Sequence, residues 1–346
     1  MGVFSKGFIY GLLAVIAVGL VFAYVVYGWI FNDNVNDSPK SEIILIPKGS
    51  SYDDVFALLK AQDILTNTSS FDRVAGLMKY KKSEVKSGRY FIEKDYSNRK
   101  IIQVLRLGEQ KPLNVTFNNV KTIAELAGAV SKYIEPDSLT LFSYLNDPEL
   151  RADKGFDQYN FMTLFIPNTY EFFWNTSKEG FLSRMEKEHD KFWTKARLAK
   201  ADALGLSKEE VYTLASIVEK ESLKKSEKDT IAGLYLNRLK QGIKLQADPT
   251  VVYGVGDFTI RRVLNKHLAY DTPYNTYMHT GLPPGPICMP NINTIDKTLN
   301  PAKHKLIYMC AKPGYAGAHN FAETDVEHIR NARKYHNWLN KEGILR

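Results

Sequence analysis

The chain has 346 residues, of which 44% are hydrophobic and 24% are charged, and its formal net charge is +8. This length and composition are typical of one large or two smaller globular domains with a real hydrophobic core. Lys and Arg are scattered among Asp and Glu, which argues against a nucleic-acid partner. Two cysteines are too few for a disulfide framework, and the sequence has no HExxH pattern, zinc-spaced Cys and His pairs, or Gly-rich phosphate loop. We therefore expect neither a metal nor a cofactor.

The N-terminal region predicts a membrane anchor. Residues 7–31 carry no charged side chain and are long enough to cross a bilayer. Lys6 precedes this stretch and Asp33 follows it, so the positive-inside rule places the N-terminus in the cytoplasm and the rest of the chain outside. A cleaved signal peptide is the alternative, but its apolar core would be shorter and would end in small residues. We expect a single-pass protein of the cell (inner) membrane, with the cytoplasmic tip, anchor and linker in residues 1–41.

Residues 42–110 predict a small module of alternating strands and helices. Ser51 and Ser97 stand where helices would begin, and Gly108 stands where one would end. The module shows no cluster of polar side chains of the kind that catalysis needs, so a binding role is its simplest interpretation. Its strands are expected at 43–46 and 87–92, and its helices at 51–65, 70–80 and 97–107.

Residues 111–346 predict a larger α+β module. The stretch 245–290 is rich in Pro, Gly, Asn and Tyr, which is too irregular for a long element and too aromatic for a flexible linker. We expect it to form the wall of a cleft. Cys288 and Cys310 could pair, although Cys310 lies in an apolar, strand-like run and could equally be a free thiol. Further elements are expected at 112–118 (strand), and at 122–133, 208–223, 226–242 and 325–341 (helices).

One carboxyl group in this module is expected in apolar surroundings, where it could act as a catalytic acid. Ser207 and Glu210 form a capping box at the start of the helix expected at 208–223. At about 100° per residue, Glu221 falls inside the apolar stripe of that helix, whereas Glu219 falls outside it and can reach water. Burial raises the pKa of a carboxyl group, so Glu221 is the candidate general acid. The apolar stripe consists of Val211, Leu214, Ile217 and Val218.

A structural role for Glu221 is the alternative. A buried carboxylate commonly pairs with a cation, and Arg238 or Lys244 from the next segment could supply one. From this helix alone the two interpretations are about equally supported.

Five sequence blocks of the larger module carry a family resemblance. They are residues 215–222 (ASIVEKES), 237–239 (NRL), 245–254 (LQADPTVVYG), 274–277 (YNTY) and 281–287 (GLPPGPI). In this order they resemble the YceG-like family of endolytic murein transglycosylases, and the resemblance extends over essentially the whole chain.

The resemblance implies a fold and a catalytic residue. It implies a LysM-like module at 42–110 and a YceG-like catalytic domain with a lysozyme-like core at 111–346. The family's catalytic Glu is the second acidic residue of a Glu-Lys-Glu triplet, which corresponds to Glu221. One position departs from the family, because Asn168 stands where Asp is usual. This weakens the case for a second catalytic carboxylate there.

The resemblance also implies a membrane-anchored lytic transglycosylase. It would cleave the β-1,4 bond between N-acetylmuramic acid and N-acetylglucosamine of nascent peptidoglycan and leave 1,6-anhydro ends. Glu221 would protonate the bridging oxygen and then, as a carboxylate, take the proton of the attacking C6 hydroxyl. A hydrolytic muramidase is one alternative, and it would need a second carboxylate, for which Asp248 is the best candidate. A non-catalytic cell-wall scaffold is another.

Further residues are candidates for substrate binding. Gln246 and Asn275 can hydrogen-bond sugar hydroxyls or N-acetyl groups, and three tyrosines, Tyr253, Tyr274 and Tyr277, offer faces for sugar stacking. Asp248 joins this set, although a turn role before proline is its favoured alternative. The expected partners are peptidoglycan glycan strands and, from the resemblance, cell-wall synthesis enzymes.

Overall fold

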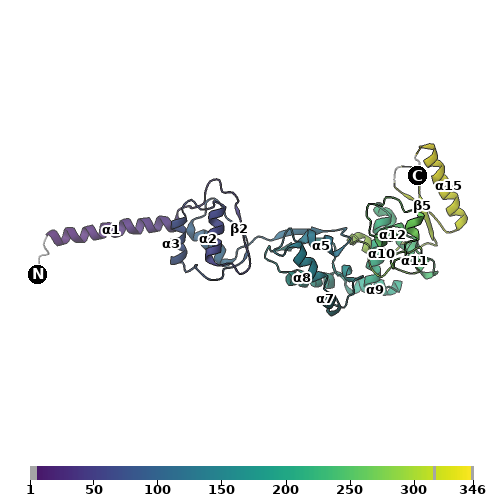
Figure 1. The fold of residues 1–346 in the computed structure, drawn as a ribbon, viewed down its shortest axis with the longest axis horizontal. Helices are drawn as coiled ribbons and strands as arrows, with labels where there is room; N and C mark the ends of the chain where they lie inside the picture. Colours follow the sequence, from purple (N-terminus) through teal and green to yellow (C-terminus); the bar gives the residue numbers. More distant parts are fainter. Residues whose placement is uncertain (1–5, 315–316, 344–346) are drawn as a thin grey trace. The chain divides into compact units, whose positions relative to one another are not determined.

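The computed structural model describes residues 6–314 and 317–343. Within this range the chain forms two compact units, which can be followed by colour in Figure 1. The first comprises residues up to 114 with two short segments, 133–135 and 171–176, and the second comprises the remainder. Both contain helices and a few strands, and each sheet of the described residues has two strands. The predicted α+β class is confirmed.

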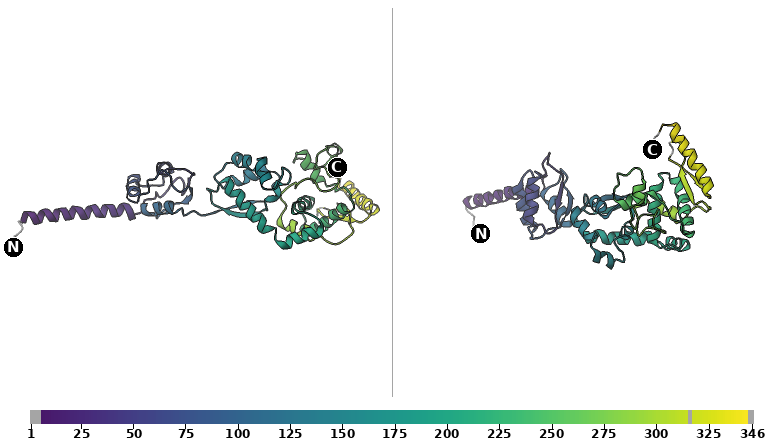
Figure 2. Two further views of the ribbon diagram at one scale, coloured as in Figure 1. Left: turned by 90° about the horizontal axis from the view of Figure 1, so that it is seen from below. Right: turned by 45° about the vertical axis from the view of Figure 1, so that its right-hand side comes forward.

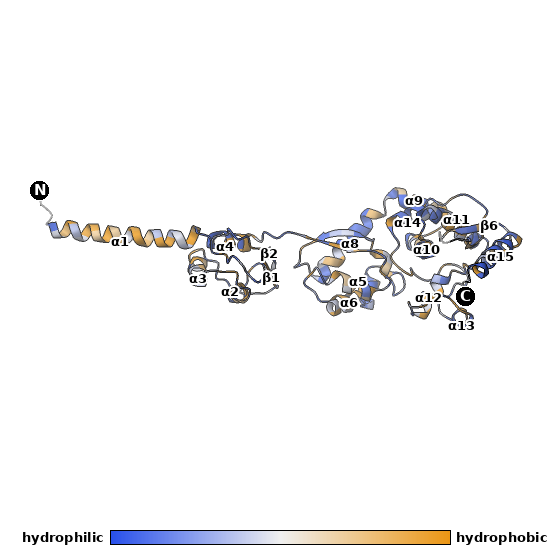
Figure 3. Cartoon of the chain, turned by 90° about the horizontal axis from the view of Figure 1, so that it is seen from above, coloured by the Kyte–Doolittle hydropathy of each residue, from blue (hydrophilic) through white to orange (hydrophobic). Residues whose placement is uncertain are grey.

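Helix α1 (Lys6–Phe31) is the apolar N-terminal element. It has 26 residues, and none of its side chains is buried in the protein. A helix of this length spans roughly 39 Å, more than the ~30 Å hydrocarbon core of a bilayer. Figure 3 shows that apolar residues dominate along its length. By length and composition it is a candidate membrane span, a test that signal sequences also pass.

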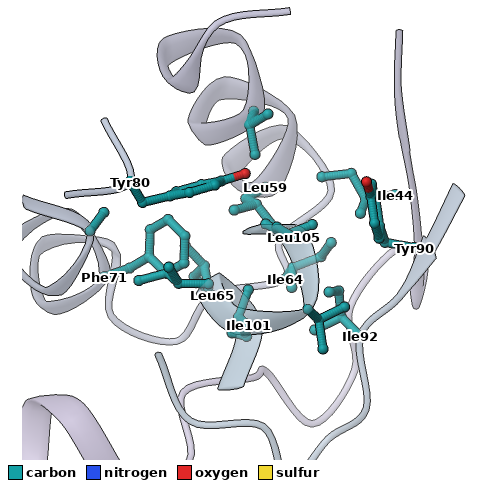
Figure 4. Close-up of a cluster of buried hydrophobic side chains, with 14 of the residues drawn as sticks. Ile44, Leu59, Ile64, Leu65, Phe71, Tyr80, Tyr90, Ile92, Ile101 and Leu105 are labelled. Atoms are coloured by element: carbon teal, nitrogen blue, oxygen red, sulfur yellow. The ribbon is translucent and has the colours of Figure 1, made fainter. Parts of the chain in front are cut away.

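The first unit packs three helices against a small antiparallel sheet. Ile43 pairs with Phe91 and Ile46 with Gly88, so alternate side chains of the strands point into the core. Figure 4 shows this core. Its elements after α1 are β1 (Ile43–Ile46), α2 (Tyr52–Ala61), α3 (Thr68–Leu77), β2 (Gly88–Phe91) and α4 (Asn98–Leu107).

Local sequence signals set most of these boundaries. Ser51 forms a capping box with Asp54, Ser97 caps α4, and Gly108 adopts the left-handed conformation that ends α4. Helix α2 stops earlier than predicted because Asp63 takes a left-handed conformation with φ of 55°.

The second unit is mostly helical. Strands β3 and β4 form one sheet, and β5 pairs with β6 in another, with Tyr308 opposite Ala322. Helix α15 lies along β5 and β6 (Figure 2). Its elements are β3 (Leu113–Phe117), α5 (Ile123–Val130), α6 (Ser138–Leu145), α7 (Pro148–Asp153), a 3₁₀ turn (Phe161–Leu164), β4 (Asn168–Phe172), α8 (Lys178–Phe192), α9 (Lys195–Leu204), α10 (Lys208–Glu221), a 3₁₀ turn (Lys225–Glu227), α11 (Lys228–Lys240), α12 (Asp248–Val255), α13 (Asn265–Leu268), α14 (Ile292–Thr298), β5 (Tyr308–Ala311), β6 (His319–Ala322) and α15 (Asp325–Lys341).

Helix α10 is the central element of this unit. It contacts α9, α11, α12 and α14. All of its residues from 211 to 218 are therefore buried, including the polar Thr213 and Ser216. The predicted apolar stripe of Val211, Leu214, Ile217 and Val218 is buried, and the residues between its members are buried too, because helices surround this stretch on several sides.

Two predicted features of the second unit differ in the structure. Helix α11 begins at Lys228, two residues later than predicted, because residues 225–227 form a 3₁₀ turn, and its N-cap Glu227 makes no side-chain capping bond. The stretch 245–290 contains α12, which composition did not indicate. Pro249 is compatible with α12 because it lies in the first turn, where its missing N–H costs nothing.

Candidate active site

Glu221 is the last residue of α10 and lines a cavity of ≈ 370 Å³. The cavity is open to solvent and lies wholly in the second unit. Helices α10 and α11, the start of α12 and strand β5 supply its walls. Its lining consists of Glu221, Leu234, Tyr235, Arg238, Leu245, Gln246, Asp248, Tyr277, Met309, Cys310, Ala311, His319 and His328.

The surroundings of Glu221 favour its protonated form. Burial raises the pKa of this carboxyl to about 7, and the nearby charge of Asp248 acts in the same direction. A hydrogen bond from Tyr235 and the charge of Arg238 act in the opposite direction. The effect of burial on the pKa is the larger one. The half-buried carboxylate loses hydrating water, and Tyr235 and Arg238 compensate for only part of that loss. Glu221 can therefore donate a proton near neutral pH and accept one afterwards.

Tyr235 holds the Glu221 carboxyl in place. Its hydroxyl donates to Oε1 of Glu221 at 2.6 Å from the facing helix α11. Its side chain is buried, which with the adjacent carboxylate keeps its own pKa well above the usual range, so it remains a donor. No sequence pattern indicated this contact, because the two residues come from different helices.

Arg238 does not pair with Glu221. Its guanidinium donates to the carbonyl oxygens of Ile307, Lys244 and Leu245 at 2.6 to 2.9 Å and to Oε1 of Gln246 at 3.2 Å. Within the described part of the chain, no ion pair joins Glu221 to Arg238 or Lys244. Arg238 instead ties α11 to the segment that carries Gln246, and it contributes a positive field.

The structure brings Gln246 and Asp248 into the cavity with Glu221. Both side chains are exposed, and Gln246 has a left-handed backbone with φ of 52°. Asp248 is the first residue of α12, not the turn residue that was the favoured alternative. Its Oδ1 accepts a hydrogen bond from the hydroxyl of Tyr277 at 2.5 Å.

The other predicted substrate contacts lie elsewhere. Asn275 is buried, and its amide donates to the carbonyl oxygens of Leu268 and Tyr270 while its oxygen accepts from the backbone N–H of Tyr277. It therefore holds the loop that presents Tyr277. Tyr274 is also buried.

Tyr253 lines a second cavity. Its ring packs against that of Tyr274 at 4.6 Å between centroids. Asn168 begins β4 and does not line the Glu221 cavity.

The expectation that Glu219 reaches water was wrong. Its side chain is 12% exposed and forms an ion pair at 2.8 Å with Lys228, which is 5% exposed. Thr294 and Asn291 also donate to this carboxylate. Burial pushes the pKa of Glu219 up, but the bonds from these three partners together hold it below its usual range. Glu219 is thus a structural anion that joins α10, α11 and α14.

His319 and the two cysteines have structural surroundings. Nδ1 of His319 lies 3.0 Å from Oε2 of Glu227, and its ring also lines the cavity. Cys288 and Cys310 are free thiols. Burial raises the pKa of Cys288 to about 12, which makes it unreactive.

The segment 281–287 is fixed against α10. The backbone N–H of Ile287 donates to Oγ of Ser216 at 3.0 Å. A Cβ on Gly285 would lie 2.0 Å from the carbonyl oxygen of Tyr159, so only glycine fits there. This close packing and the three prolines of the segment restrict its conformation.

We expect Tyr235→Phe to lower activity about tenfold and to raise the pKa of Glu221 further. The hydroxyl of Tyr235 stabilises the carboxylate, so its loss favours the protonated form and leaves the carboxyl less well oriented. The pH profile of kcat/KM measures both effects, because its alkaline limb should move to higher pH. A uniform loss of activity with an unmoved limb would contradict this role.

Residues 44–334 match the model of the YceG-like family. A Bacillus subtilis (strain 168) relative named endolytic murein transglycosylase is 29% identical over 316 residues, which are 86% of each chain. A Streptococcus pneumoniae relative of the same name is 24% identical over 96% of this chain, which spans 66% of that relative.

A solved structure agrees with these sequence matches. The crystal structure of a yceG-like protein from Listeria monocytogenes is 26% identical and superposes with a TM-score of 0.56, covering 84% of this chain and 98% of that one. Because the family match spans most of the sequence, the chain belongs to the YceG-like family.

Proposed function

We propose that this chain is a membrane-anchored endolytic lytic transglycosylase. Its substrate is the β-1,4 bond between N-acetylmuramic acid and N-acetylglucosamine in nascent peptidoglycan. One observation carries the proposal: Glu221, with a pKa raised to about 7, lines an open cavity and is held by Tyr235. The family and the names of the relatives support the substrate class.

A single carboxyl group can carry the reaction. Protonated Glu221 donates its proton to the bridging oxygen as the bond from C1 breaks. The resulting carboxylate then accepts the proton of the C6 hydroxyl, whose oxygen bonds to C1 and closes a 1,6-anhydro ring. Glu221 ends protonated again, and no water is consumed. A pKa near neutrality suits both steps, since the group must donate and then accept.

The neighbouring side chains have supporting roles in this proposal. Asp248, held by Tyr277, places a negative charge in the same cavity, where positive charge develops on the sugar ring in the transition state. Gln246 is exposed and can bond a sugar hydroxyl or N-acetyl group. The first unit, a LysM-like module in the proposal, binds glycan and does no chemistry.

The mass of the product tests the reaction. We expect the full chain in detergent to convert peptidoglycan strands to fragments that each carry a 1,6-anhydro end, lighter by one water than a hydrolytic end. Mass spectrometry of the digest measures this, and cuts within strands distinguish endolytic from terminal action. Reducing ends would indicate a hydrolytic muramidase, and absence of cleavage would indicate a scaffold.

The proposal places the second unit outside the cytoplasm. The apolar helix α1 and the charges on either side of it support this orientation. A reporter fused after Arg346 should be active only if it works outside the cytoplasm, and activity of a cytoplasm-only reporter would overturn both location and substrate. Contact with cell-wall synthesis enzymes is part of the proposal, and co-purification with a peptidoglycan polymerase from solubilised membranes tests it.

A further inference from the structure

A second cavity lies beside the Glu221 cavity in the second unit. Its volume is ≈ 540 Å³, and Asp248 at the start of α12 lines both cavities. Four of its lining residues are cations, and Asp248 is the one anion among them. Its lining consists of Lys121, Lys220, Asp248, Pro249, Val252, Tyr253, Phe258, Ile260, Arg261, Arg262, Val263 and Ile287.

The cations of this cavity are not neutralised by the protein. Lys220 donates to the amide oxygen of Asn119 at 2.6 Å, and the ammonium of Lys121 lies 4.2 Å from the centroid of the Phe258 ring. Both partners are uncharged. Within residues 6–314 and 317–343, no carboxylate lies within ion-pair distance of Lys121, Lys220, Arg261 or Arg262. The cavity therefore has an unbalanced positive charge that attracts anions.

Lys220 connects this cavity to the candidate active site. It precedes Glu221 in α10, and consecutive helical residues point about 100° apart. Each of the three residues of the Glu-Lys-Glu triplet therefore faces a different environment. Glu219 is in the internal ion pair, Lys220 faces the cationic cavity, and Glu221 faces the candidate active site.

The rest of the lining defines the ligand further. The lining also contains several apolar side chains, among them Val252, Phe258 and Ile260, which suits a chain of small residues bearing several carboxylates better than a bare inorganic anion. In peptidoglycan the muramic acid whose C1 is cleaved carries such a peptide on its lactyl group. That peptide starts on the same sugar as the reacting bond, and Asp248 lines both cavities, so a peptide on that sugar can extend from the Glu221 cavity into the second one.

We propose that the cationic cavity binds the carboxylates of the stem peptide on the sugar being cleaved. The inference rests on the proposed function for the identity of the substrate. Lys121 and Lys220, which are half-buried, form the inner charges, and Arg261 and Arg262, which are exposed, form the rim. The enzyme thus selects strands that carry peptides over strands from which the peptides have been removed.

Equilibrium binding to the full chain in detergent tests this inference. The protein carries Glu221→Gln to prevent turnover, and the ligands are peptidoglycan tetrasaccharides with peptides, without peptides, and with the peptide carboxylates capped as amides. We expect the native peptide to tighten binding about tenfold, equivalent to ~1.4 kcal/mol, and capping to abolish the gain. The gain should shrink at high salt because exposed charges are screened.

Two charge-matched variants show where the gain arises. The double variant Arg261→Gln, Arg262→Gln should lose the gain in affinity that the peptide provides. The control variant Lys187→Gln, Lys191→Gln removes two exposed charges from α8 and should keep that gain. The inference would be overturned if the arginine variant kept the affinity gain, or if the lysine variant lost it to the same extent. It would also be overturned if the unvaried protein bound peptide-free and peptide-bearing ligands equally well.

A lipid pyrophosphate is the competing source of negative charge. Inorganic pyrophosphate that binds with the same dependence on Arg261 and Arg262, without any gain from the peptide, would overturn the inference in favour of that source. Cleavage of peptide-bearing strands by the unmutated chain tests the proposed function separately. Its absence alongside an arginine-dependent peptide gain would refute the reaction and leave the peptide site standing.

Discussion

Glu221→Gln should lower glycan cleavage by about 10²- to 10⁴-fold, the usual contribution of general acid and base catalysis. The amide keeps the shape of the side chain and can still accept the hydrogen bond from Tyr235, but it cannot donate and then recover a proton. Release of anhydro fragments, followed by mass spectrometry, measures the loss. Activity within a few-fold of the unmutated chain would refute the assigned role.

The same substitution should raise stability above neutral pH. The pKa of Glu221 is raised in the folded state, so the folded chain holds a proton that the unfolded chain loses from about pH 4.5 upward. Folding stability therefore falls as pH rises from about 4.5 to about 7, and the full loss of stability persists at every pH above about 7. Glu221→Gln removes this penalty, on the order of 1–3 kcal/mol at pH 8 and none near pH 4.5. Urea unfolding at the two pH values provides the measurement.

The pH dependence of activity follows from the same shift. Proton donation requires the protonated form, so kcat/KM should fall above about pH 7, by roughly tenfold per pH unit. An alkaline limb near pH 5 would indicate that a carboxyl with an ordinary pKa does this work.

Glu219→Gln should destabilise the fold by about 3 kcal/mol. It leaves the ammonium of Lys228 buried without a counter-charge, and breaking a buried ion pair from one side costs about 3–5 kcal/mol. The amide retains part of the hydrogen bonding, which places the expected loss at the lower end. Urea unfolding at pH 7 measures it. Activity per folded molecule should change little, because Glu219 does not line the Glu221 cavity.

The ion pair of Glu186 and Lys154 on the surface is the matched control for the buried ion pair of Glu219. Glu186 lies 2.9 Å from Lys154 with both side chains about 30% exposed, so Glu186→Gln should cost no more than ~1 kcal/mol. The pKa of Glu219 is depressed, so its contribution is present above about pH 4.5 and is lost as pH falls through the lower folded value. The difference between Glu219→Gln and the unmutated chain should therefore vanish in acid. Equal effects of the two substitutions at pH 7 would contradict the buried ion pair.

Local signals made much of the fold predictable. Capping by Ser51, Ser97 and Ser207 depends on residues three positions away, and the short apolar strands are bounded by turn residues. The helix that carries Glu221 was predicted for the same reason, with an end two residues beyond the observed one. Helix α12 was missed because Pro249 and the surrounding glycines are typical of loops, and only its position in the first turn makes the proline compatible with a helix.

Contacts between distant segments were not predictable. Glu219 lies on the polar side of its helical wheel, yet Lys228 of α11, Thr294 of α14 and the N-cap residue of α14, Asn291, all contact it. Asn275 has side-chain groups that could bind a sugar, but its amide donates to the backbone carbonyls of Leu268 and Tyr270 instead. A helical wheel describes a single helix, whereas the contacts between side chains of different helices depend on how those helices pack.

The position of Glu221 at the very end of α10 has an electrostatic consequence. Backbone dipoles sum along a helix to about half a negative charge at its C-terminus, which disfavours a carboxylate and favours a cation there. The helix end thus helps to keep Glu221 protonated before the reaction. In the proposed mechanism it would also stabilise the positive charge that develops at C1, so that the backbone of α10 would supply some of the negative potential that a glycosidase obtains from its second carboxylate.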